Sequence, residues 1–108
     1  MRGYIAGMAF TWVHKKRVAS DQGFSVQMTG LHSWEYAEND QRMSLEGEFL
    51  HPKDEVGSKF TYAFYPSWRN ARWEPPHHYD DITASDRLRI RTNMIEGIAF
   101  MGGKAIFD

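Results

Sequence analysis

The sequence contains no cysteine, so disulfide bonds and thiolate metal sites are excluded. No apolar run approaches the ~20 residues of a membrane-spanning helix, and the apolar stretch 1–13 is interrupted by glycines and lacks the features of a signal peptide. We therefore expect a cytoplasmic protein that does not contact a membrane. The 13 Lys and Arg residues are balanced by 14 Asp and Glu residues without a basic stripe, so nucleic acid is not an expected partner.

Motifs for nucleophilic catalysis are also missing, because neither GxSxG nor SxxK occurs in the chain. The densest group of possible metal ligands is the run His77, His78, Tyr79, Asp80 and Asp81. Metal sites need ligands whose side chains converge, and adjacent histidines in a loop diverge as easily as they converge. We therefore expect no catalytic residue, no cofactor and no metal, and we interpret this run as a hydrated loop.

The chain is long enough for one domain with its own core, and we expect residues 1–108 to form it. Aromatic residues make up 15% of the sequence, which favours a sheet-rich core. Alternating apolar residues predict strands at 24–29, 60–64 and 104–108. Residues 1–22 are either an edge strand or a leader that packs only through its aromatic side chains, and 15–23 reads as a polar connection.

A hairpin is the best local signal. Its predicted arms are 31–37 and 42–50, on either side of Glu38-Asn39-Asp40-Gln41, where Asn and Asp tolerate turn conformations. A shift of one residue in register would bury Glu46 and Glu48, so the alternate residues must face the core. These core-facing residues are His32, Trp34, Tyr36, Met43, Leu45, Gly47 and Phe49.

One long helix is predicted at about 84–101. Thr83 or Ser85 can cap its first turn, with Asp86 completing a capping box, and Gly102-Gly103 can end it. The predicted buried stripe consists of Leu88, Ile95, Ile98 and Ala99, widened by Ile90, Met94 and Met101, with Arg89, Asn93 and Glu96 on the wet face.

Arg91 falls inside the apolar arc of this helix, at ~100° per residue. A buried charge without a partner is costly, so we expect Arg91 to pair with Glu48, or failing that with Glu46, and to hold the helix in register on the sheet. The alternative is that Arg91 binds an anion.

The four tryptophans exceed what a small core normally hides, although most should be core residues. We expect Trp73 to be buried between helix and sheet. Segment 67–73 should form a turn followed by an extended piece, because Pro75 disfavours helix before it. An exposed tryptophan, if there is one, should be Trp68 or Trp73. The weak candidates for contact with a partner are Trp68, Arg69, His77, His78, Tyr79, Asp80 and Asp81.

These elements predict an α+β fold: a bent antiparallel sheet of five to seven strands, one long C-terminal helix packed on it, and a short closing strand.

The order of motifs resembles a family of small bacterial proteins classed as predicted immunity proteins of polymorphic toxin systems. The shared features are Glu46-Gly47-Glu48 on a hairpin arm, an aromatic strand, Arg72-Trp73-Glu74-Pro75-Pro76, an acidic loop, and a helix that opens with Ile82-Thr83. The resemblance covers about Val26 to Asp108. It implies that Glu48, Trp73, Pro76 and Arg91 support the fold rather than contact a toxin.

The resemblance implies a non-catalytic protein that binds another protein, with a toxin domain as the implied partner. The alternative is a small ligand-binding domain with a pocket between helix and sheet. Composition and pattern do not determine the oligomeric state.

Overall fold

A computed structural model describes residues 2–5, 8–50, 59–64 and 67–107. The predicted α+β class is confirmed, with one long α-helix in the described part of the chain. In chain order the elements are β1 (Arg2–Ile5), β2 (Met8–His14), β3 (Arg17–Ser20), β4 (Phe24–Gly30), β5 (Ser33–Glu38), β6 (Gln41–Glu46), β7 (Glu48–Leu50), β8 (Phe60–Ala63), the 3-10 helix η1 (Ser67–Asn70), α1 (Ala84–Phe100) and β9 (Gly103–Ile106).

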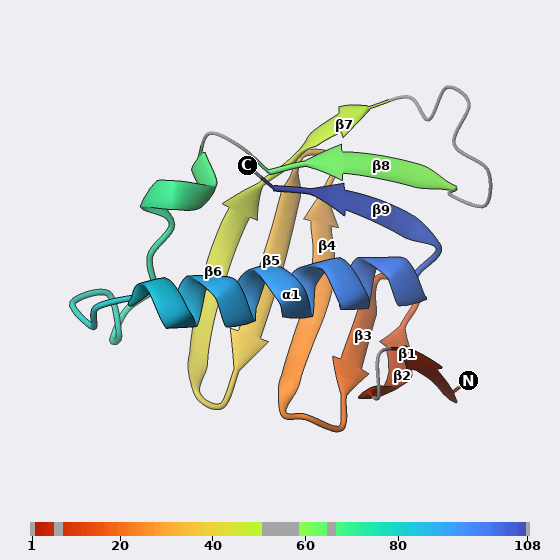
Figure 1. Ribbon diagram of the computed structural model, residues 1–108, viewed down its shortest axis with the longest axis horizontal. Coiled ribbons are helices and arrows are strands. Elements are labelled where there is room, and N and C mark those ends of the chain that lie inside the picture. The colour runs from red at the N-terminus through yellow and green to blue at the C-terminus, as the bar shows by residue number, and fades with distance from the viewer. Residues whose placement is uncertain (1, 6–7, 51–58, 65–66, 108) are drawn as a thin grey trace.

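Strands β1 to β6 form an antiparallel meander in which each strand pairs with the next along the chain (Figure 1). The predicted hairpin is β5–β6, and its turn places Asn39 at φ 54°, a left-handed conformation that asparagine tolerates. Trp34, Tyr36 and Met43 are completely buried, as the alternation predicted, whereas His32 is exposed.

Two expectations for the first third of the chain need correction. Segment 15–23 is more than a polar connection, because β3 lies within it and pairs with both β2 and β4. The edge strand expected within 1–22 is in fact two strands, β1 and β2, which pair with each other. The described part of 1–22 is therefore sheet rather than a leader, and Phe10 is completely buried.

A second sheet of three strands, in the order β7-β8-β9, was not predicted. The chain passes from one sheet to the other at Gly47, where a Cβ would lie 2.9 Å from the ring of Phe64 and 3.0 Å from that of Tyr62. The closing strand β9 pairs parallel to β8, because α1 carries the chain back across the fold before β9 begins.

Helix α1 crosses one face of the six-stranded sheet (Figure 1). Its predicted N-cap is confirmed: Thr83 and Asp86 form a capping box, and Gly102 follows the helix at φ 97°. The predicted stripe is only partly right, because Leu88 is 62% exposed and Ala99 is also exposed. The buried helix residues are Ile90, Asn93, Met94, Gly97 and Ile98.

Gly97 sets the distance between helix and sheet. A Cβ at this position would lie 2.7 Å from Cγ2 of Val26 on β4, closer than side chains approach. The helix backbone therefore packs directly on the sheet, and Ile90, Met94 and Ile98 are completely buried beside it. The helix–sheet interface is filled by side chains at these positions.

Trp73 is 4% exposed, which confirms its predicted burial, and its ring lies 6.4 Å from that of Tyr36. The predicted turn in 67–73 is η1, and residues 71–74 after it belong to no helix or strand. Within the described part of the chain, no helix combines the length and apolar character needed to cross a membrane.

Candidate functional site

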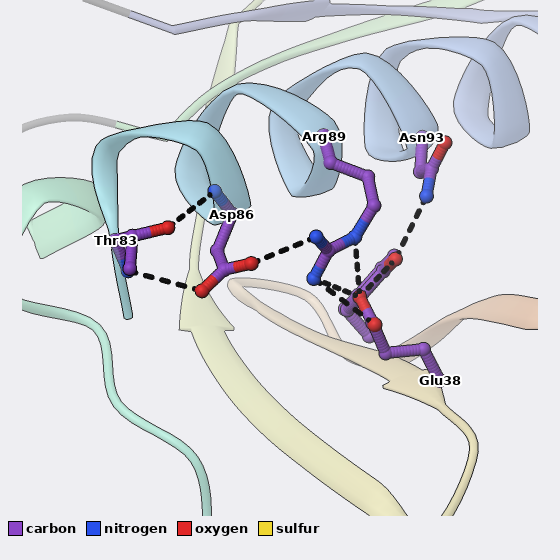
Figure 2. A network of polar contacts seen from close by, with 6 residues as sticks. Glu38, Thr83, Asp86, Arg89 and Asn93 are labelled. Atoms are coloured by element: carbon purple, nitrogen blue, oxygen red, sulfur yellow. Dashed lines mark hydrogen bonds and ion pairs between the residues drawn. The ribbon is translucent and has the colours of Figure 1, made fainter. Parts of the chain in front are cut away.

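A chain of hydrogen bonds joins helix α1 to the sheet and starts at the helix N-cap (Figure 2). The Asp86 carboxylate accepts from the backbone N–H of Thr83 at 3.0 Å and from Nη1 of Arg89 at 2.8 Å. Arg89 also donates through Nε and Nη2 to the Glu38 carboxylate at the end of β5, at 3.1–3.3 Å. Arg89 thus joins the first turn of α1 to the β5–β6 hairpin.

The same chain continues into the core. Glu38 accepts from the Tyr36 hydroxyl at 2.8 Å, and that hydroxyl accepts from Nδ2 of Asn93, also at 2.8 Å. Asn93 is 8% exposed, so its predicted place on the wet face is wrong. The sequence gives little indication that Asn93 is buried, because an asparagine within a helix is usually solvated. Its burial is explained by the hydrogen bond to the Tyr36 hydroxyl on the sheet.

The ionisation of these groups follows from their contacts. Burial raises the pKa of Tyr36, and the neighbouring Glu38 carboxylate adds to this effect, whereas the hydrogen bond from Asn93 opposes it. The hydrogen bond from Arg89 lowers the pKa of Asp86, with further lowering by the bonds from Thr83. All three donor nitrogens of Arg89 are engaged, so this network has a structural role and offers little to a ligand.

The predicted pairing of Arg91 with Glu48 is wrong. Glu48 is exposed on β7, and among the described residues no hydrogen bond or ion pair joins Arg91 to Glu48 or to Glu46. The Arg91 side chain is half-buried. The register role expected of Arg91 belongs to Arg89, two residues earlier, because the helix is rotated relative to the predicted stripe.

The loop His77–Asp81 is joined to the β5–β6 turn. The His77 ring lies between two carboxylates, with Nδ1 3.1 Å from Asp80 and Nε2 3.2 Å from Asp40. Both contacts are hydrogen bonds at once only when each ring nitrogen carries a proton. The described residues contain no group of three or more His, Cys, Asp or Glu side chains arranged to hold a metal.

Of the other residues of this loop, Tyr79, Asp80 and Asp81 are exposed and His78 is half-buried. Tyr79 is 87% exposed, and its ring lies 4.1 Å from that of His78. The loop therefore presents an aromatic ring and two carboxylates beside the hairpin turn.

Trp68 does not share this exposure, which removes it from the surface candidates. It is 4% exposed, its ring lies 5.0 Å from that of Phe107, and the guanidinium of Arg87 lies 5.9 Å from its ring centre. Arg87 also donates to the backbone carbonyl oxygens of Trp68 and Ala71. The Arg69 side chain lies outside the described part of the structure. Pro76, expected to support the fold, is exposed and follows a cis peptide bond.

The six-stranded sheet carries surface depressions that the sequence analysis missed. A depression of about 230 Å³ is lined by residues of β3, β4 and β5 and of the turns that follow β3 and β5, among them Arg17 and Ser25. A second depression, of about 410 Å³, shares Arg17 with the first and extends to Asp40 and Arg42. Ala37 and Asn39 also line both depressions.

Strand alternation is the signal that places Arg17 and Ser25 on the outer face of the sheet, because each precedes a buried valine, Val18 or Val26. The sequence analysis could not use this signal for Arg17, because it did not assign the segment that contains Arg17 to a strand.

A third depression, of about 460 Å³, lies between β6 and segment 70–72. Beside it the edge of β6 is partly covered by the chain itself, because the backbone N–H of Glu74 donates to the Arg42 carbonyl at 2.7 Å. The Ser44 hydroxyl also donates to the Glu74 carboxylate. This cover protects an edge strand from pairing with other chains.

The geometry defines a small α+β protein in which a helix covers one face of an antiparallel sheet and open depressions lie elsewhere on the surface of the sheet. Comparison of the chain with protein-family models, with curated proteins and with solved structures found no match. The resemblance to predicted immunity proteins over Val26 to Asp108 therefore stays a prediction.

Proposed function

We propose that this protein is a non-catalytic binding protein that contacts a protein partner through its hairpin-end surface. We define this surface as the two depressions that share Arg17, the β5–β6 turn with Asp40, and the loop His77–Asp81. The sequence resemblance favours a bacterial toxin domain as the partner and a cytoplasmic immunity role for this chain.

The attachment of the loop to the hairpin is the observation that carries this proposal. His77 contacts Asp40 and Asp80, so the loop is held against the turn rather than left to move independently. Tyr79 is 87% exposed beside this attachment, and tyrosine and arginine are enriched among residues that dominate protein interfaces. An exposed aromatic ring on a loop that is held against the hairpin turn suits recognition of a protein surface.

The alternative, a ligand pocket between helix and sheet, has less support. Ile90, Met94 and Ile98 are completely buried in that interface, and Gly97 contacts Val26 directly. Small-molecule sites are enclosed and mostly apolar. The depressions on the hairpin-end surface are open and flanked by charged side chains, which suits a protein better than a small apolar ligand.

The test is a calorimetric titration with the protein encoded by the neighbouring gene. We expect a 1:1 complex, and we expect Tyr79→Ala to raise Kd by roughly 10–30-fold, since truncation of an interface hot spot costs about 2 kcal/mol. Leu88→Ala is the matched control, because Leu88 is also exposed but lies on the outer side of α1. No complex with the wild-type protein would refute the immunity role. Equal losses of affinity in Tyr79→Ala and Leu88→Ala would show that the partner does not bind at the hairpin-end surface.

A further inference from the structure

Arg17 is a cation with no carboxylate partner among the described residues. It lies at the start of β3, opposite Gln27 of β4, with its side chain half-buried on the face away from α1. Its single side-chain hydrogen bond in that part of the structure runs from Nη2 to the Ser25 hydroxyl at 3.1 Å. A hydroxyl orients the guanidinium without neutralising its charge.

The depression beside Arg17 contains donors that lack acceptors. Nε of Arg17 is shielded from solvent and has no hydrogen-bond partner. Ser25 is 8% exposed and accepts from Arg17, which leaves its own proton available. Ser20, in the same depression, accepts from the backbone N–H of Gln22. Nε is out of reach of solvent and therefore of a ligand, so the donors open to an acceptor are those at the Nη end of the guanidinium and the Ser25 hydroxyl.

Nearby carboxylates do not fill that role. Glu38 lines the depression, but its oxygens accept from Arg89 and from Tyr36. Glu35 lines only the second depression and forms no ion pair with Arg17 in the described structure. The floor next to Ser25 consists of Ala19 and Ala37, its register neighbours on β3 and β5, and their small size leaves room above Ser25.

We propose that Arg17 and Ser25 form a binding site for one carboxylate group. The Nη1 and Nη2 groups of Arg17 can donate two parallel hydrogen bonds to one carboxylate, and Ser25 adds a third donor from the adjacent strand. The inference concerns a site on this chain and holds whether or not the protein partner exists. The carboxylate belongs either to a free small acid or to an acidic side chain of a polypeptide.

The test is an NMR titration that follows the Nε–H resonance of Arg17 at constant ionic strength, with acetate as the probe. We expect a saturable shift with a Kd in the millimolar range. Arg17→Gln should abolish saturation at the neighbouring backbone amides, and Arg17→Lys should weaken binding because it keeps the charge but loses the two parallel donors. Ser25→Ala should weaken binding by several-fold.

Lys16→Gln is the matched control, because it removes one positive charge from an exposed position next to Arg17. A chemical shift that grows linearly with acetate concentration without saturating would refute the site. A loss of binding in Lys16→Gln equal to that in Arg17→Gln would also refute it, because acetate would then respond only to the general positive charge of this surface. Blocked tripeptides with a central aspartate or asparagine distinguish the two sources. Tighter binding of the aspartate peptide than of acetate assigns the site to polypeptides, whereas equal affinity assigns it to free carboxylates.

Discussion

The ion pair between Arg89 and Glu38 provides the sharpest test of how α1 is held on the sheet. Replacing Arg89 with methionine keeps the aliphatic stem and removes the guanidinium. Glu38 then retains only the Tyr36 hydroxyl among its described donors, and Asp86 loses its bond from Arg89. We expect Arg89→Met to lower the free energy of unfolding.

The magnitude follows from the exposure of the two partners. The Glu38 side chain is 14% exposed and that of Arg89 is 44% exposed. Fully exposed ion pairs contribute ~0–1 kcal/mol, and breaking a buried pair costs ~3–5 kcal/mol. This pair lies between the two cases but nearer the exposed one, because Arg89 reaches solvent. We therefore expect a loss of about 1–2 kcal/mol, which corresponds to a fall in Tm of roughly 4–8 °C in a domain of this size.

Urea unfolding of Arg89→Met and Arg91→Met measures this difference directly. Arg91→Met is the matched control, because it makes the same change on the same helix at an arginine without a described carboxylate partner. We expect it to change stability by less than ~0.5 kcal/mol. The double variant Arg89→Met/Glu38→Gln should lose less than the sum of the single losses. A larger loss for Arg91→Met than for Arg89→Met would refute the assignment of the pair.

Three further predictions concern burial, charge and close packing. Trp73→Ala should cost ~3–5 kcal/mol and populate the unfolded state, because a 4% exposed indole leaves a cavity; an unchanged Tm by calorimetry would contradict this. The pKa of Asp86 is lowered in the folded protein, so its contribution should be present above the unfolded value of about 4 and lost as pH falls through the folded value. In a plot of Tm against pH, Asp86→Asn should reduce the fall in Tm on the acid side. An unchanged fall would exclude a contribution of the Asp86 carboxylate to stability. Gly97→Ala should destabilise by ~1–3 kcal/mol, although alanine favours helix, because its Cβ would meet Val26, and a gain in stability would disprove the close contact.

Much of the fold could be predicted because its signals are local. Alternation places Trp34, Tyr36 and Met43 on one face, since a strand alternates sides regardless of its neighbours. The helix limits follow from a capping box at Thr83 and from Gly102, both of which act through backbone groups within one turn. These features need no knowledge of the tertiary fold.

The rotation of the helix could not be predicted in the same way. An apolar arc that includes Leu88 and one that includes Ile90 are both compatible with the sequence, because the stripe is broad. The choice depends on Gly97, which permits the closest approach to Val26, and on Tyr36, which gives Asn93 a buried partner. The residues that Gly97 and Asn93 meet, Val26 and Tyr36, lie on strands far away in the sequence.

The sequence by itself determined the α+β class, the β5–β6 hairpin and the ends of α1, because each depends on residues within a few positions of one another. Only the tertiary structure decided that Arg89 rather than Arg91 pairs with the sheet, and that Glu38 rather than Glu48 receives it. It also decided that His77 contacts Asp40 and that Arg17 and Ser25 share a depression. These contacts join separate elements of the fold, and their geometry depends on sheet register and helix rotation, which the packing of the whole core sets.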